Sequence, residues 1–197
     1  MNQRLLTIHS YLSYFYNLVI NPSNPYVMKK VLYLVLFCHS ISNITASEVD
    51  SVKRLDNFSN IYRYQNYFIS GQPSLEALEF LNSKGVSTII NLRSVDENDK
   101  FKGSGYNEQR RVNDLGMVYF SLPVSTNKDY TPENLARFDS VISASDGVLI
   151  HCAGAGRARY FFIAYLIKYK GYNEEKAFSI GQQMGYSDRI KLLLEEY

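Results

Sequence analysis

The part of the sequence with the clearest capacity for chemistry is residues 152–159, which read Cys-Ala-Gly-Ala-Gly-Arg-Ala-Arg. An apolar segment, Val148–His151, precedes this run, and a second apolar segment follows it at 160–167. A strand, a loop of small residues and a helix N-terminus in that order favour anion binding, because consecutive backbone N–H groups can converge on a ligand and the helix dipole attracts negative charge. The residues that we expect to bind phosphate are Ala153, Gly154, Ala155, Gly156, Arg157 and Ala158.

Cys152 lies at the base of this cradle, where the same amide groups would stabilise a thiolate and make it a nucleophile. Arg157 can fold back over the loop and hold two oxygens of a phosphoryl group with its planar guanidinium. Together the two side chains predict a covalent phosphocysteine intermediate. The alternative is that Cys152 is a small buried residue at a strand end and that the glycines only permit a turn.

Several separated motifs carry a resemblance to a known family. Residues 150–157 (IHCAGAGR) resemble the His-Cys…Arg signature of cysteine-based protein tyrosine and dual-specificity phosphatases. Residues 68–74 (FISGQPS), 89–93 (IINLR) and 122–124 (LPV) are similar, more narrowly, to bacterial dual-specificity-like phosphatases that are sometimes labelled beta-lactamase-hydrolase-like. The similarity covers about residues 60–185 and implies a phosphatase acting on phosphotyrosine, phosphoserine or small phosphoesters.

The resemblance also implies roles for side chains outside the loop. Phosphatases of this superfamily protonate the leaving group from an Asp that precedes the cysteine, which implies Asp129 as the acid and then as the base for the hydrolytic water. Asp129 could instead be a solvated or helix-capping residue, and Asp96 is then the alternative acid. His151 would support the loop by hydrogen bonds, and Arg93 would orient the acid or bind a carboxylate in the core.

Departures from the family pattern leave other functions open. Most phosphatases of the superfamily have one more residue between Cys and Arg than this chain has, whereas the narrower bacterial group has the shorter spacing seen here. Ala158 replaces the Ser or Thr that eases departure of the thiolate, so hydrolysis of the intermediate would be slow. Arg159 is a second candidate guanidinium. The alternatives are a rhodanese-like sulfurtransferase and a catalytically impaired, phosphate-binding pseudophosphatase.

The elements that must position this loop alternate along the chain. Strands are predicted at 67–69, 86–92, 117–124 and 147–151, and helices from Ser74, over 108–115, from Thr131, after Arg159, and from caps near Asn173 and Ser187. The polar residues at 94–107 are predicted to form a loop. This order predicts an α/β fold with a mainly parallel central sheet flanked by helices, like that of a dual-specificity phosphatase. Right-handed crossovers would gather the loops at the carboxyl edge of the sheet.

Charge is unevenly distributed along the chain of 197 residues, because all 19 acidic residues follow residue 47. Two lysines at 29–30 are followed by an apolar run at 31–38, which is the order of a secretory signal. We therefore predict that residues 1–46 are a signal or leader segment and that residues 47–197 form an exported, periplasmic or secreted phosphatase-like domain. The alternative is that an uncleaved N-terminal segment anchors the protein in a membrane.

Composition excludes several other classes. The formal net charge of +2 gives no electrostatic footprint for nucleic acid, and two cysteines cannot form a disulfide framework. His9, His39 and His151 do not make a metal site, so we expect neither a metal nor another cofactor. The expected partner is a phosphorylated protein or a small phosphoester, with no nucleic acid and no stable membrane contact after signal cleavage.

Overall fold

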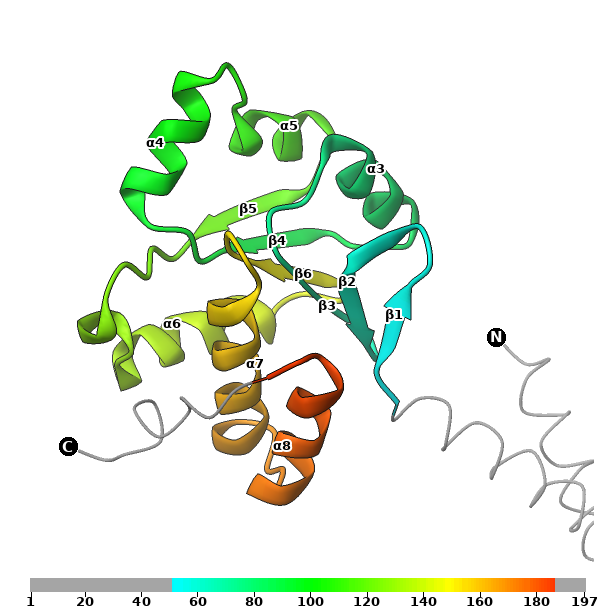
Figure 1. Ribbon diagram of the computed structural model, residues 1–197, viewed down its shortest axis with the longest axis vertical. Coiled ribbons are helices and arrows are strands. Elements are labelled where there is room, and N and C mark those ends of the chain that lie inside the picture. The colour runs from blue at the N-terminus through cyan, green and yellow to red at the C-terminus, as the bar shows by residue number, and fades with distance from the viewer. Residues whose placement is uncertain (1–50, 187–197) are drawn as a thin grey trace, which may run out of the picture. The chain divides into compact units, whose positions relative to one another are not determined.

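The computed structural model describes residues 51–186, which form a six-stranded mixed sheet with helices on both faces (Figure 1). The strands are β1 (Lys53–Leu55), β2 (Phe58–Tyr64), β3 (Tyr67–Ser70), β4 (Thr88–Asn91), β5 (Val118–Ser121) and β6 (Val148–His151). The helices are α3 (Leu75–Ser83), α4 (Val95–Gly103), α5 (Glu108–Asp114), the 3-10 helix η1 (Asn127–Asp129), α6 (Pro132–Ile142), α7 (Gly156–Lys168) and α8 (Glu174–Gln183).

The strands are arranged in the order β1-β2-β3-β6-β4-β5. Strands β3, β6, β4 and β5 are parallel, whereas β1 and β2 are antiparallel to their neighbours. Strand β6 lies between β3 and β4, with Leu149 in register with Phe68 on one side and Ile89 on the other. The predicted α/β fold with a mainly parallel sheet is confirmed, and the β1–β2 hairpin extends the sheet beyond the predicted strands.

The two faces of the sheet are covered by different helices. Alternate strand residues point to opposite faces, so Ile69, Ile90 and Ile150 pack in one core cluster with residues of α6, α7 and α8. Phe68, Ile89 and Leu149 pack in the other cluster, with residues of α3 and α5. This arrangement explains why the central strands are buried along their whole length and predominantly apolar, as strands covered on both faces are.

Polar side chains cap the helices where the sequence predicts. Ser74 accepts a hydrogen bond from Ala77 at the start of α3, Thr131 caps α6, and Asn173 caps α8. Gly85 follows α3 with a φ of 86°, a left-handed conformation that glycine adopts without steric cost. The predicted cap at Ser187 lies outside the described residues.

The prediction of a loop at 94–107 is wrong, because Val95–Gly103 is helix α4. Its first turn is fixed by a capping box, in which Ser94 and Glu97 each accept a hydrogen bond from the backbone N–H of the other. No residue of α4 is buried, so the segment lacks the apolar periodicity that marks most helices in a sequence. The Ser-x-x-Glu spacing was the signal that could have revealed it.

The predicted leader at 1–46 also lies outside the described residues. Within residues 51–186, no helix is both long and apolar enough to cross a membrane.

Candidate active site

The loops that follow the parallel strands meet at the carboxyl edge of the sheet. The amide of Cys152, just after β6, donates to the carbonyl of Ser70 at the end of β3 (3.4 Å), and the amide of Gln72 donates to the carbonyl of Ala153 (3.1 Å). Gly71 permits this approach, because a Cβ at this position would lie 2.9 Å from the oxygen of Ala153. The loop that contains Cys152 is therefore held against the turn after β3 by backbone contacts.

Helix α7 begins directly after this loop and has no side-chain cap. Its N-cap residue, Ala155, adopts a left-handed conformation with φ 68° and makes no side-chain hydrogen bond to the helix. The other α-helices in the described region are capped by Ser, Thr or Asn side chains. Because the first amides of an α-helix have no partner within the helix, those of α7 remain available to an anion.

A cavity of about 320 Å³ opens at this helix N-terminus. It is lined by Tyr130, Cys152, Gly154, Gly156, Arg157, Arg159, Gly185 and Tyr186. Cys152 is only 1% exposed and contributes to the floor of the cavity. The structure thus brings together the predicted nucleophile, the predicted guanidinium and part of the predicted phosphate-binding loop.

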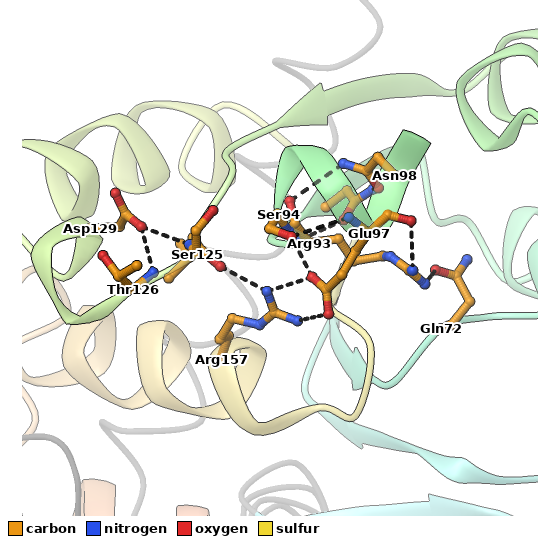
Figure 2. A network of polar contacts seen from close by, with 11 residues as sticks. Gln72, Arg93, Ser94, Glu97, Asn98, Ser125, Thr126, Asp129 and Arg157 are labelled. Atoms are coloured by element: carbon orange, nitrogen blue, oxygen red, sulfur yellow. Dashed lines mark hydrogen bonds and ion pairs between the residues drawn. The ribbon is translucent and has the colours of Figure 1, made fainter. Parts of the chain in front are cut away.

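The guanidinium of Arg157 is held by a bidentate ion pair with Glu97 from α4 (Figure 2). Nη1 donates to Oε2 at 2.7 Å and Nη2 donates to Oε1 at 2.8 Å, while Nη1 also donates to the carbonyl of Val124 at 2.7 Å. The hydrogen bonds from Arg157 lower the pKa of Glu97 to about 2, so this carboxylate is ionised at neutral pH. Burial alone would lower the pKa of Arg157, but Glu97 and Cys152 together raise it.

These contacts leave part of the guanidinium available to a substrate. An arginine side chain carries five N–H donors, and Glu97 and Val124 engage three of them. The remaining donors are Nε–H and one hydrogen of Nη2. They can form the paired hydrogen bonds to two phosphoryl oxygens that arginine favours.

Glu97 has no role among the predictions from the sequence, whereas its neighbour Asp96 is the predicted alternative acid. Asp96 is exposed and is not among the residues that line the cavity. Glu97 lies one position further along the first turn of α4, where its side chain reaches both the amide of Ser94 and the guanidinium of Arg157. The capping box is the sequence signal that could have indicated its orientation.

Arg93 supports the position of α4. It is 5% exposed, donates from Nη1 to Gln72 at 2.6 Å and from Nη2 to the carbonyl of Glu97 at 3.0 Å, and lies 4.0 Å from the ring centre of Phe101. Figure 2 shows this arginine reaching between Gln72 and the turn that carries Glu97. The sequence predicts that Arg93 orients the acid or binds a carboxylate in the core. None of these hydrogen bonds goes to the carboxylate of Asp129. They hold the segment that presents Glu97 to Arg157.

His151 is fully buried beside a second polar cluster. Its Nε2 lies 3.3 Å from Oε2 of Glu108, but the two atoms are not aligned as a hydrogen bond. Glu108 also accepts hydrogen bonds from Gln72 (2.6 Å) and Asn91 (3.0 Å). Burial raises the pKa of Glu108, but His151 and the hydrogen-bond donors outweigh it and the net shift is downward. His151 therefore lies behind the loop and does not line the cavity.

Asp129 lies at the end of η1, on the loop between β5 and α6. Its Oδ2 accepts hydrogen bonds from the amides of Ser125 and Thr126, both at 2.7 Å, and these bonds lower its pKa. Asp129 is half-buried and does not line the cavity, whereas the next residue, Tyr130, does. The carboxylate thus has a capping role, and its role as an acid stays a prediction.

Among residues 51–186, no group of three His, Cys, Asp or Glu side chains is placed to hold a metal ion.

Comparisons with known proteins agree with this architecture. A model of the family described as DSP-PTPase phosphatase fused to NAD+ kinase matches residues 39–185. The fold is similar to the crystal structure of TpbA from P. aeruginosa, with a TM-score of 0.53 at 19% identity over 71% of this chain and 82% of that one. A Cys-to-Ser variant of TpbA in complex with pTyr gives a TM-score of 0.53 at 17% identity, over 73% of this chain and 86% of that one. The comparison with curated proteins gave no match.

The structural likeness establishes a shared fold, and the family model covers the whole sheet, the loop around Cys152 and the helices that pack on them. The resemblance of the sequence motifs to dual-specificity-like phosphatases is confirmed by that match. This chain belongs to the family of dual-specificity-like tyrosine phosphatases described as DSP-PTPase phosphatase fused to NAD+ kinase.

Proposed function

We propose that this chain is a cysteine-dependent phosphatase that hydrolyses phosphate monoesters through a phosphocysteine intermediate. The observation that carries the proposal is the uncapped N-terminus of α7, with Cys152 at its base and a fixed guanidinium from Arg157 beside it. Amides and a guanidinium arranged in advance around an anion are the main means of stabilising charge in such a transition state.

The reaction follows from this arrangement. The thiolate of Cys152 attacks phosphorus, so that the S–P bond forms while the bond from phosphorus to the ester oxygen breaks. Arg157 and the loop amides hold the equatorial oxygens, and the leaving oxygen takes a proton from Asp129. The deprotonated Asp129 then takes a proton from a water molecule as its oxygen attacks phosphorus, the S–P bond breaks, and inorganic phosphate leaves with the thiolate of Cys152 and the acid form of Asp129 restored.

The basic test measures hydrolysis of p-nitrophenyl phosphate by the full chain with a reducing agent and EDTA. We expect turnover in the parent protein and none in Cys152→Ser. Cys38→Ser is the matched control, because Cys38 is the only other cysteine of the chain. Turnover that survives in Cys152→Ser, or that is lost equally in both variants, would contradict the phosphocysteine mechanism.

The role of Asp129 requires a separate test, because its carboxylate already caps a loop. If Asp129 is the acid, Asp129→Asn should slow phenyl phosphate, a poor leaving group, about 100-fold and 2,4-dinitrophenyl phosphate only slightly. If Asp129 only caps the loop, the variant should slow both esters to the same extent. The ratio of the two rates therefore separates the two roles.

Two observations favour a second candidate, a phosphate-binding pseudophosphatase. No carboxylate is among the described residues that line the cavity, and Ala158 supplies no hydroxyl after the arginine. Tight binding of phosphate or a phosphopeptide by the folded protein without turnover would support this candidate. The match to a phosphatase family argues against the sulfurtransferase alternative, which a thiosulfate–cyanide assay would test directly.

We also propose that the protein is exported and that residues 1–46 are removed as a leader, since the charge pattern of the N-terminal segment is that of a secretory signal. Expression with cell fractionation and mass determination of the N-terminus tests this. A full-length chain that remains in the cytosol would contradict export, and a full-length chain in the membrane fraction would indicate an uncleaved anchor.

A further inference from the structure

The cavity above Cys152 contains a second guanidinium that the proposed reaction does not use. Arg157 and Arg159 both line it. Residues two positions apart in an α-helix diverge by about 200° around the axis, and the two side chains reach opposite ways. Arg157 reaches α4. Arg159 reaches β2, where its guanidinium lies 5.4 Å from the ring centre of Tyr62, and also the chain just after α8, where it contacts Gly185.

The two guanidinium groups differ in how their charge is balanced. Arg157 is paired with Glu97. Within residues 51–186, no carboxylate forms an ion pair with Arg159. The described contacts of Arg159 are a hydrogen bond from Nη1 to the carbonyl of Gly185 at 3.1 Å and the contact with Tyr62. Its positive charge is therefore uncompensated in the described region, beside the cavity that contains the nucleophile.

The donors of Arg159 also remain largely available. The bond to Gly185 uses one N–H of Nη1, and Nε is buried without a partner. The second hydrogen of Nη1 and both hydrogens of Nη2 have no partner among the described residues, and Nη2 is not enclosed. Arg159 can therefore bind an anionic group in the cavity without giving up its bond to Gly185.

The cavity has space for more than the phosphoryl group. Its volume of about 320 Å³ is several times the volume that one phosphate occupies, and Tyr130 and Tyr186 contribute aromatic surface to its walls. A substrate whose phosphate lies on Cys152 and Arg157 would extend between these rings. A negatively charged group elsewhere on that substrate would then come within reach of Arg159.

We propose that Arg159 is a specificity residue for substrates that carry a second anionic group, a carboxylate or a phosphate, close to the phosphate ester that is cleaved. This inference rests on the proposed function, because it places the ester at Cys152. It goes further in stating that the preferred substrate is an ester with two anionic groups, one bound by Arg157 and the loop amides and the other by Arg159.

The test compares phenyl phosphate with its 3-carboxy and 4-carboxy derivatives, two isomers that place a carboxylate at different distances from the ester. Binding to the full-length Cys152→Ser protein is measured by calorimetry, so that turnover does not interfere. We expect the better of the carboxylated esters to bind about tenfold more tightly than phenyl phosphate, as one charge-assisted hydrogen bond provides. In the Cys152→Ser protein that also carries Arg159→Gln, the ratio of the affinity for the carboxylated ester to the affinity for phenyl phosphate should fall to about one.

Arg63→Gln is the matched control. Arg63 also lies over an aromatic ring, 5.6 Å from the centre of Phe68, and donates to a backbone carbonyl, but it does not line the cavity. The ratio should be unchanged in this variant. A ratio of about one in the parent protein, or an unchanged ratio after Arg159→Gln, would overturn the inference.

Failure of the inference and failure of the proposed function give different results. If phenyl phosphate and its derivatives all bind with equal affinity, the phosphate site stands and the role of Arg159 is overturned. If none of the esters binds to a protein that circular dichroism shows to be folded, the phosphate site itself is absent, and both proposals are overturned.

Discussion

The ion pair between Glu97 and Arg157 gives the sharpest test of how this site is organised. In Glu97→Gln, the amide can accept only one of the two hydrogen bonds from the guanidinium, and the amide nitrogen opposes the other. We expect Arg157 to lose its fixed orientation, and the kcat/KM for p-nitrophenyl phosphate to fall about tenfold, because Arg157 would then bind the phosphoryl oxygens in a less favourable geometry.

The stability change can be worked from the pKa of Glu97. A decrease from 4.5 to about 2 corresponds to about 3 kcal/mol at most. Since the two side chains are 19% and 31% exposed, solvent screening reduces this to about 1 kcal/mol. The pKa of Glu97 is lower in the folded state, so its contribution is complete above pH 4.5 and is lost as the pH falls toward 2.

Urea unfolding at pH 7 and at pH 3 measures this difference. Glu97→Gln should be about 1 kcal/mol less stable than the parent at pH 7, and about half of that difference or less should remain at pH 3, which lies between the two pKa values. Asp99→Asn is the control for stability, because Asp99 lies on the same helix in an exposed pair with Lys102.

A rise in kcat/KM for Glu97→Gln would refute the reasoning, since it would mean that Glu97 competes with the phosphate for Arg157.

Three further variants test the rest of the site. Ala155→Gly should stabilise the protein by about 1 kcal/mol in thermal unfolding, because Ala155 holds a left-handed φ of 68°; a lower Tm would contradict this. Gly71→Ala should reduce kcat at least tenfold while far-UV circular dichroism stays unchanged, because the added methyl would displace the carbonyl of Ala153 next to the nucleophile; unchanged kcat would show that the turn yields freely. Glu108→Gln should cost about 2 kcal/mol in urea unfolding, because it removes a buried, charge-assisted acceptor from Gln72 and Asn91; an unchanged free energy of unfolding would show that the charge of Glu108 does not stabilise the fold.

The fold was largely predictable from local features of the sequence. The signals that predict these elements each extend over only a few residues, so they can be recognised without tertiary information. They are the apolar runs around Ile89 and Leu149, the cap at Ser74 and the helix start at Thr131-Pro132. Helix α4 was missed because it buries no residue. Its only signal was the capping box, which fixes where a helix begins but says little about whether it continues.

The sequence by itself determined which residues could form the phosphate cradle, because strand, small-residue loop and helix are contiguous around Cys152. Only the tertiary structure decided what surrounds them. Glu97 meets Arg157 from a helix about 60 positions earlier in the chain, and Asp129 is held by the amides of its own loop. Such pairings depend on side-chain directions at the carboxyl edge of the sheet, where loops from four parallel strands converge. The spacing of residues along the chain does not predict those side-chain directions, because the crossovers between the strands determine how the loops are oriented toward one another.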